Sequence, residues 1–229
     1  MREVPVLWDG GRATTARVYE ASSPALTLVL AHGAGAGQQS AFMVDFATAL
    51  AALGLDVVTF NFLYTEQKRR APDRTPVLEA CYRAVVETVR NEVASAARAL
   101  VIGGKSMGGR MATHVAAADR SLPIDGLVLL GYPLHPPGRP DQRRDAHLPA
   151  VGRPMLFVQG SRDTFGTPDE LRPVLDTIEP APTLHVVEGG DHSFKPSRGG
   201  SAALAAIHGD VQRRIAEWTA ALIPRAARS

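Results

Sequence analysis

The sequence has one cysteine, Cys81, among its 229 residues, so no disulfide can form within the chain. Cys81 lies in a helical pattern, and we expect it to be a small core residue. Aromatic residues make up only 6% of the chain, and basic residues are scattered. A nucleic-acid-binding surface would instead show a basic stripe interleaved with aromatics. We interpret the tight basic runs at 68–70, 143–144 and 213–214 as solvated surface.

Long apolar runs are also missing. No stretch approaches the roughly 18 uninterrupted apolar residues of a membrane span, and residues 1–5 lack the charged and then apolar sections of a secretory signal. The His and Asp residues do not follow a zinc-ligand spacing, so we expect no metal and no organic cofactor. These absences predict a cytoplasmic protein without membrane or nucleic-acid partners. The sequence gives no basis for an oligomeric state.

What the sequence does have is an alternation of short β-rich runs and longer helical patterns. Its length and its hydrophobic content of 45% suit a single α/β domain over residues 1–229. The expected strands are 26–31, 56–60, 99–102, 126–130, 155–159 and 184–187, and the expected helices are 41–53, 76–96, 107–118, 168–177 and 202–222. Segments 4–8 and 16–19 are expected to add an antiparallel hairpin at the edge. The pattern predicts a mostly parallel sheet with helices on both faces, and ligands then bind beyond the carboxyl ends of the strands.

One such strand end carries the stretch GGKSMGGR, which places Ser106 between Gly104 and Gly108. A G-x-S-x-G match arises by chance in roughly one chain in ten of this size. An ordinary loop is therefore the alternative, but the junction of strand, turn and helix favours a nucleophile elbow. Glycine is needed there because neighbouring segments pass too close for side chains. The N–H of Met107, at the start of the helix, would be available to an oxyanion.

A serine nucleophile needs a base, and His192 is the best candidate among the seven histidines. It alone lies in a glycine-containing loop, GGDHSF, after a late strand. The carboxylate that would orient it is expected to be Asp163, in the loop GSRDTFG one strand earlier. Asp191 is a rival, although its adjacency to His192 makes the required orientation awkward. The order Ser, Asp, His is the chain order of an α/β-hydrolase.

A second glycine-rich stretch, HGAGAG at residues 32–37, follows the strand expected at 26–31. It is either a turn, shaped in part by His32, or a loop whose N–H groups approach a ligand. A phosphate site is disfavoured, because the spacing matches neither the Walker pattern nor a well-placed dinucleotide fingerprint.

Taken together, the motifs HGAGAG, GGKSMGGR, GYPLHPPG, GSRDTFGTPDEL and GGDHSFK resemble the α/β-hydrolase superfamily, and more narrowly its compact dienelactone-hydrolase-like group. The subgroup resembled includes a subunit of the non-specific-lethal chromatin complex. The resemblance implies that Ser106 is the nucleophile, His192 the base and Asp163 the acid. It also implies that the backbone N–H groups of Met107 and Ala34, or of Gly35 in place of Ala34, hold the oxyanion.

The function predicted is hydrolysis of a small-molecule ester, thioester or related acyl substrate. Dienelactone hydrolases proper have cysteine at the position of Ser106, so their substrate is not implied. An acyltransferase or peptidase with the same triad is one alternative, and a noncatalytic binding or scaffold protein is another.

Specificity is expected to lie in two loops, residues 62–76 and 131–154, which would form the walls of an open site without a lid domain. The candidate substrate contacts are Tyr64, Lys105 and His135, with Arg139 and Arg144 as further loop residues. For the loop residues among them, the sequence favours solvated positions over substrate contacts. Lys105 adjoins Ser106 and either packs its stem beside the elbow or biases the site toward anions.

Overall fold

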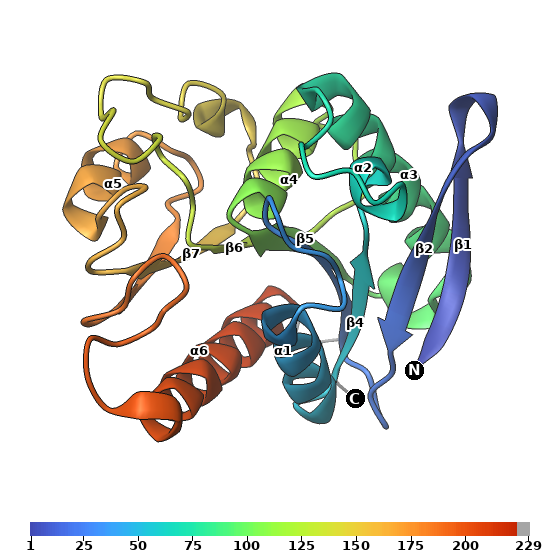
Figure 1. The fold of residues 1–229 in the computed structure, drawn as a ribbon. Helices are drawn as coiled ribbons and strands as arrows, with labels where there is room; N and C mark the ends of the chain where they lie inside the picture. The colour runs from blue at the N-terminus through green and yellow to red at the C-terminus, as the bar shows by residue number, and fades with distance from the viewer. Residues whose placement is uncertain (224–229) are drawn as a thin grey trace.

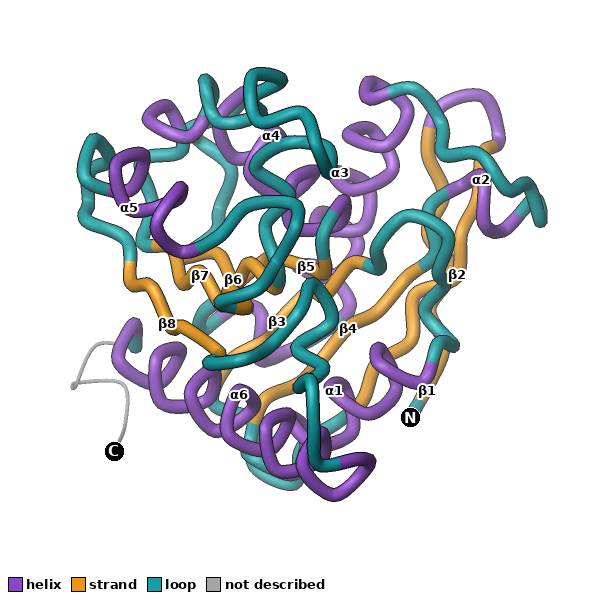
Figure 2. Tube along the Cα trace, turned by 60° about the vertical axis from the view of Figure 1, so that its left-hand side comes forward, coloured by secondary structure: helices purple, strands orange, loops and turns teal. Residues whose placement is uncertain are grey.

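The structure, a computed structural model, describes residues 1–223 and is built on an eight-stranded sheet (Figures 1 and 2). The strands are β1 (Arg2–Trp8), β2 (Arg12–Tyr19), β3 (Leu26–Ala31), β4 (Leu55–Phe60), β5 (Leu100–Lys105), β6 (Gly126–Leu130), β7 (Met155–Gly160) and β8 (Thr183–Val187). The helices are α1 (Ala41–Ala52), α2 (Leu63–Glu66), α3 (Thr75–Glu92), α4 (Met107–Ala118), α5 (Pro168–Leu175) and α6 (Gly200–Leu222).

The strand order is β1-β2-β4-β3-β5-β6-β7-β8, and the six strands from β4 to β8 in this order run parallel. The hairpin of β1 and β2 joins the edge antiparallel to β4, as its sequence predicts. The expected mostly parallel α/β sheet is therefore confirmed. The crossover from β3 leads to β4 on one side, and the next crossover, from β4, passes β3 and leads to β5 on its other side. The carboxyl ends of β3 and β5 thus form the switch point at which such sheets bind ligands.

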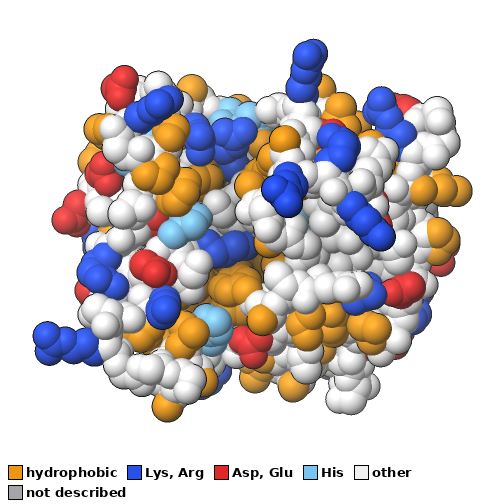
Figure 3. All heavy atoms as spheres, viewed as in Figure 1, with side chains coloured by type: hydrophobic (Ala, Val, Ile, Leu, Met, Phe, Trp, Pro, Cys, Tyr) orange, Lys and Arg blue, Asp and Glu red, His pale blue; other side chains and the backbone are white. Residues whose placement is uncertain are grey.

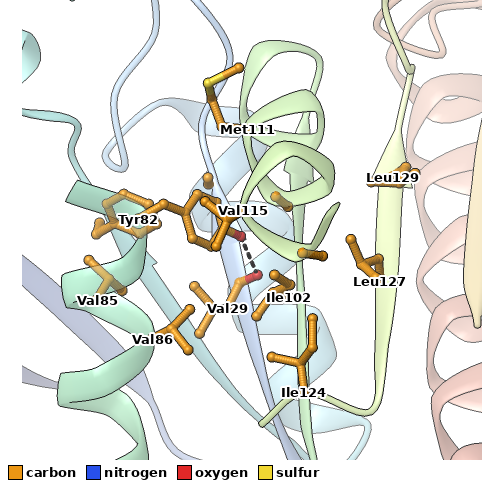
Figure 4. Close-up of a cluster of buried hydrophobic side chains, with 14 of the residues drawn as sticks. Val29, Tyr82, Val85, Val86, Ile102, Met111, Val115, Ile124, Leu127 and Leu129 are labelled. Atoms are coloured by element: carbon orange, nitrogen blue, oxygen red, sulfur yellow. Dashed lines mark hydrogen bonds between the residues drawn. The ribbon is translucent and has the colours of Figure 1, made fainter. Parts of the chain in front are cut away.

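Helices cover both faces of the sheet, with α1 and α6 on one face and α3 and α4 on the other (Figure 2). Strands β3 to β7 are buried along their whole length, which explains why they read as nearly continuous apolar runs. Figure 4 shows the core between the sheet and α3, where Tyr82 points its hydroxyl toward Val29 and Ile102 lies beside it. The same hydroxyl donates to Gly103 O at 2.6 Å and accepts from Gly103 N at 3.0 Å. Cys81 is buried in this core, as expected.

The ends of β5 and α3 differ from the sequence-based expectation, and β2 begins at Arg12 instead of Ala16. Strand β5 continues through Gly103 and Gly104 to Lys105, because these residues pair with β3 and β6 despite their low strand propensity. Helix α3 ends at Glu92 instead of Ala96, because Val93 turns to an extended conformation and a separate 3-10 turn follows.

The connection between β6 and β7 contains no lid. Its one regular element is the 3-10 turn Leu148–Ala150. A membrane-spanning helix would have to be longer and more apolar than any found in residues 1–223.

Candidate active site

The turn after β5 places Ser106 in a strained backbone conformation. Its φ of 51° and ψ of −114° lie where a residue with a side chain is rarely found. Glycine on either side is a steric requirement. A Cβ at Gly104 would lie 2.5 Å from the backbone oxygen of Ala31, and one at Gly108 would overlap the same oxygen. This tight junction of strand, turn and helix presents the Ser106 hydroxyl at the carboxyl end of the sheet.

The structure brings Ser106, His192 and Asp163 together in one hydrogen-bonded chain. His192 Nε2 lies 2.8 Å from Ser106 Oγ, and His192 Nδ1 lies 2.8 Å from Asp163 Oδ2. An imidazole that donates from Nδ1 to the carboxylate keeps Nε2 free to accept the serine proton. The convergence follows from topology, because β7 and β8 are neighbours and their loops leave the same edge of the sheet.

Asp163 is fully buried, and each of its oxygens has a donor. Gln159 Nε2 donates to Oδ2 at 2.9 Å, and the N–H of Phe165 donates to Oδ1 at 2.8 Å. The sequence analysis missed Gln159, which is fully buried at the end of β7. A polar residue at the end of an otherwise apolar strand, just before the loop of the acid, was the available signal.

Asp191 does not take the place of Asp163. Its Oδ1 accepts from the N–H groups of Ser193 and Lys195, at 2.8 and 2.9 Å, so it shapes the loop that carries His192. The ring of Phe165 stacks on the imidazole of His192, with centroids 4.2 Å apart. The orientation of the imidazole is thus fixed by the hydrogen bond to Asp163 and by the stacked ring of Phe165.

Lys105 ties the turn after β5 to the loop of His192. Its ammonium donates to the backbone carbonyl of His192 and lies 5.6 Å from the ring centroid of Phe194. Gly131 has a φ of 62°, and a Cβ there would lie 2.8 Å from Lys105 Nζ and 3.0 Å from the backbone oxygen of His192, so the backbone conformation and the close contacts both favour glycine. Burial lowers the pKa of Lys105 to about 8, against the opposing attraction of Asp163 and Asp191.

The glycine loop at 32–37 lies against the same turn. A Cβ at Gly33 would lie 3.6 Å from Ser106 Cβ, and Ala34 and Met107 both line the cavity in front of Ser106. Met107 is the first residue of α4, so its N–H has no partner inside the helix. Gly35, with a φ of 73°, shapes the loop and is not among the cavity-lining residues.

Ser106 opens into a cavity with a volume of about 1080 Å³, which Figure 3 shows as a hollow with hydrophobic side chains inside it. Both loops expected to form its walls do so, through residues such as Pro72 in one and Pro133 in the other. A further wall, from α1 and α6, was not expected. It includes Phe42 and His208, and His208 Nδ1 bonds to Asp45 Oδ2 at 3.0 Å.

The structure does not bring Tyr64 and His135 to this cavity. The Tyr64 side chain is buried against His32, with ring centroids 6.0 Å apart. His135 is buried beside α5, where Nε2 lies 3.2 Å from Glu170 Oε1. Both residues sit in segments that do border the site, but packing turns their rings into the interior. Lys105, by contrast, lines the cavity.

The two loop arginines named as possible substrate contacts, Arg139 and Arg144, differ in position. Arg139 is exposed and lies outside the cavity lining, whereas Arg144 is half-buried and lines it. The expectation of a solvated 143–144 run is therefore wrong for Arg144, because the loop folds back over the cavity. Within residues 1–223, no group of three or more His, Cys, Asp or Glu side chains is arranged to hold a metal ion.

Solved structures with the same fold include serine hydrolases. Dienelactone hydrolase from Anabaena variabilis ATCC 29413 superposes with a TM-score of 0.76 at 19% identity, covering 97% of this chain and 99% of that one. An α/β serine hydrolase without lid from Xanthomonas campestris gives 0.71 at 22% identity, covering 95% and 94%. An α/β serine hydrolase homologue from Coxiella burnetii gives 0.74 at 17% identity, covering 93% and 96%.

A family model described as "Alpha/beta hydrolase domain" matches residues 24–220, which span every strand that carries a candidate site residue. The match agrees with the sheet order, the turn at Ser106 and the solved neighbours. This chain belongs to the α/β hydrolase domain family.

Proposed function

We propose that this protein is a serine hydrolase that cleaves an ester, thioester or related acyl bond, with Ser106 as nucleophile, His192 as base and Asp163 as the acid that orients the base. The observation that carries the proposal is the pair of 2.8 Å contacts that link Ser106 Oγ through the imidazole to Asp163 Oδ2. The family supports hydrolysis in general, and this geometry supports the individual roles.

In the first step Ser106 Oγ attacks the acyl carbon of the substrate. A new C–O bond forms, the carbonyl electron pair moves onto its oxygen, and the serine proton passes to His192 Nε2. The imidazolium that results is stabilised by the carboxylate of Asp163, which is buried and already held by two other donors. Because those donors fix the carboxylate beforehand, little reorganisation is needed during the reaction.

The negative oxygen of the intermediate would be held by the N–H groups of Met107 and Ala34. Both residues line the cavity beside Ser106, and the Met107 N–H lies at the positive end of α4. Collapse of the intermediate breaks the bond to the leaving group, which takes the proton from His192. Water then attacks the acyl-enzyme by the same route and regenerates Ser106.

Covalent labelling with a fluorophosphonate tests the proposal directly. The intact protein is treated with the reagent and analysed by mass spectrometry, together with Ser106→Ala and with Ser40→Ala as a matched control. Ser40 also lines the cavity but has no imidazole bonded to its hydroxyl. We expect one label, lost in Ser106→Ala and kept in Ser40→Ala.

A screen of esters, thioesters and amides, with alcohols and amines as acceptors, then separates hydrolysis from acyl transfer and peptidase activity. Labelling of a folded protein at no serine would overturn the proposal in favour of a binding or scaffold role. The narrower resemblance, to the subgroup with the chromatin-complex subunit, stays a prediction, because the shared fold does not distinguish subgroups.

A further inference from the structure

Two arginines, Arg110 and Arg144, line the same cavity as Ser106. They come from different segments, since Arg110 lies in α4 and Arg144 in the loop between β6 and β7. Arg110 is one turn along the helix from Ser106, about 6 Å along its axis, and its N–H bonds to Ser106 O at 3.0 Å. The reacting group and a guanidinium are thus placed on consecutive turns of one element.

The backbone of Arg144 is fixed from both sides. Its N–H donates to Leu134 O at 2.9 Å, and its carbonyl accepts from the Tyr132 hydroxyl at 2.7 Å. Tyr132 itself is buried in the core. The position of Arg144 at the cavity is therefore set by the fold of the loop.

Neither guanidinium has a hydrogen-bond or ion-pair partner within the described part of the chain. The other arginines of residues 1–223 that lack a partner are all exposed: Arg12, Arg70, Arg74, Arg98, Arg139 and Arg198. Among the arginines of residues 1–223, only Arg110 and Arg144 combine partial burial with the absence of a partner. A half-buried guanidinium without an anion is an unfavourable arrangement unless a ligand supplies one.

The carboxylates around the pair are already engaged. Asp145 is held by Arg143 at 2.7 Å, and Asp73 is held by Arg69 and by the N–H of Tyr64 at 2.9 Å. Within residues 1–223, no hydrogen bond or ion pair joins either carboxylate to Arg110 or Arg144. These carboxylates therefore do not neutralise Arg110 and Arg144, and the positive charge of the pair is available to an anionic ligand.

The charge of Arg110 also affects the groups around it. Burial lowers the pKa of Arg144, and the positive charge of Arg110 lowers it further. Burial lowers the pKa of His114 and of His147, and the charge of Arg110 lowers both further, in His147 after the effect of His114, so both imidazoles are favoured in the neutral form. The positive charge of Arg110 thus acts on three neighbouring groups, Arg144, His114 and His147.

We propose that Arg110 and Arg144 form an anion-binding subsite of the cavity that selects acyl substrates carrying a carboxylate a short chain away from the reacting carbonyl. This inference rests on the proposed function, because it assigns a substrate class to the same site. Two guanidinium groups that converge on one cavity offer parallel N–H donors to the two oxygens of a carboxylate. The apolar wall near Phe42 would hold the uncharged part of the substrate.

The test compares esters that differ only in the charged group. On the acyl side, mono-4-nitrophenyl adipate is paired with 4-nitrophenyl hexanoate, in which a methyl group replaces the carboxylate. On the alcohol side, 4-hexanoyloxybenzoate is paired with phenyl hexanoate. The quantity measured is the ratio of kcat/KM for the charged ester to that for its neutral partner, because a general loss of folding or chemistry cancels in this ratio.

We expect Arg110→Gln and Arg144→Gln each to lower this ratio by about 10- to 100-fold for at least one pair, as the loss of a charge-assisted hydrogen bond implies. Arg139→Gln is the matched control. It removes the same charge from the same loop, outside the cavity, and should leave the ratio unchanged.

The outcomes separate the two proposals. Hydrolysis of both members of each pair, with ratios that do not depend on Arg110 or Arg144, would overturn the subsite and leave the serine hydrolase standing. If none of the four esters is hydrolysed, fluorophosphonate labelling of Ser106 decides the proposed function, and calorimetric titration with adipate decides the subsite. Binding that is lost in both arginine variants and kept in Arg139→Gln would support it, and the absence of binding to the unmodified protein would overturn it.

Discussion

Replacing Lys105 with methionine is expected to make the protein more stable and less active. The lysine is 9% exposed, and its ammonium meets one carbonyl oxygen, that of His192, and the ring of Phe194. Methionine retains the apolar stem and removes the buried charge. The substitution therefore separates the cost of burying a cation from its use in the site.

The magnitude follows from the pKa of Lys105, which burial lowers to about 8 from an ordinary 10.5. This difference corresponds to about 3 kcal/mol by which the folded protein disfavours the charged form. Loss of the bond to the His192 carbonyl offsets about 1 kcal/mol of the gain. We expect Lys105→Met to raise the free energy of unfolding by about 2 kcal/mol at pH 7.

The sign of the pH dependence is fixed by the same values. Between pH 8 and 10.5 the unfolded chain holds a proton on Lys105 that the folded protein has released, so the wild-type protein gains stability as the pH rises. The methionine variant cannot gain in this way. Its advantage should therefore be complete below pH 8 and lost by about pH 10.5, which urea denaturation at several pH values would measure.

Activity should change in the opposite direction. Without the ammonium, the His192 loop is no longer tied to the turn of Ser106, and we expect kcat/KM to fall about tenfold for a neutral ester. Lys195→Met removes an exposed lysine near the same loop and should alter the free energy of unfolding by less than about 0.5 kcal/mol. A Lys105→Met variant whose stability difference stays constant or grows from pH 8 to 10.5 would refute the reasoning.

Three further substitutions test the site and its support. Asp163→Asn should lower kcat by about 10³- to 10⁴-fold while the protein stays folded, because the amide cannot hold the imidazole in the required tautomer; steady-state ester hydrolysis and circular dichroism measure this. Gly108→Ala should cost more than about 3 kcal/mol of stability, because the new methyl group would overlap Ala31 O; thermal unfolding measures the loss. Tyr82→Phe should cost about 1 to 3 kcal/mol in urea denaturation, because the N–H and carbonyl of Gly103 lose a buried partner.

For each of these three substitutions, one result would contradict the prediction. Near-normal kcat in Asp163→Asn would point to another acid. Gly209→Ala, in the interior of α6, is the control for Gly108→Ala, because its methyl group meets nothing closer than 3.5 Å and should stabilise the helix by about 0.5 to 1 kcal/mol. Equal stabilities for the two alanine variants would contradict the steric argument. Unchanged stability in Tyr82→Phe would show that the buried hydroxyl contributes nothing.

Much of the fold could be predicted because its signals are local. The apolar runs of β3, β4, β5, β6 and β7 predicted strands buried on both faces, and the helical patterns between them predicted the crossovers. The ends of α3 and β5 were missed because tertiary pairing overrode local propensity. Gly103 and Gly104 are poor strand formers, yet they extend β5 because β3 and β6 lie on either side of them.

The candidate site was accessible for a related reason. In a parallel sheet, the residues that follow the strands all gather at one edge, so Ser106, Asp163 and His192 could be named from their places in the chain. The sequence did not indicate which other side chains hold the three site residues in place. One example is Gln159, which donates a hydrogen bond to Asp163. Such contacts depend on side-chain direction at single positions, which periodicity does not encode.

The sequence by itself determined the order of strands and helices, the tight turn at Ser106 and the loops that carry its partners, because hydrophobic period and glycine placement act over a few residues. Only the tertiary structure decided that Tyr64 and His135 turn inward while Arg110 and Arg144 converge on one cavity. These side chains come from segments far apart in the chain. Their directions follow from the packing of whole elements against one another, which no short stretch of sequence contains.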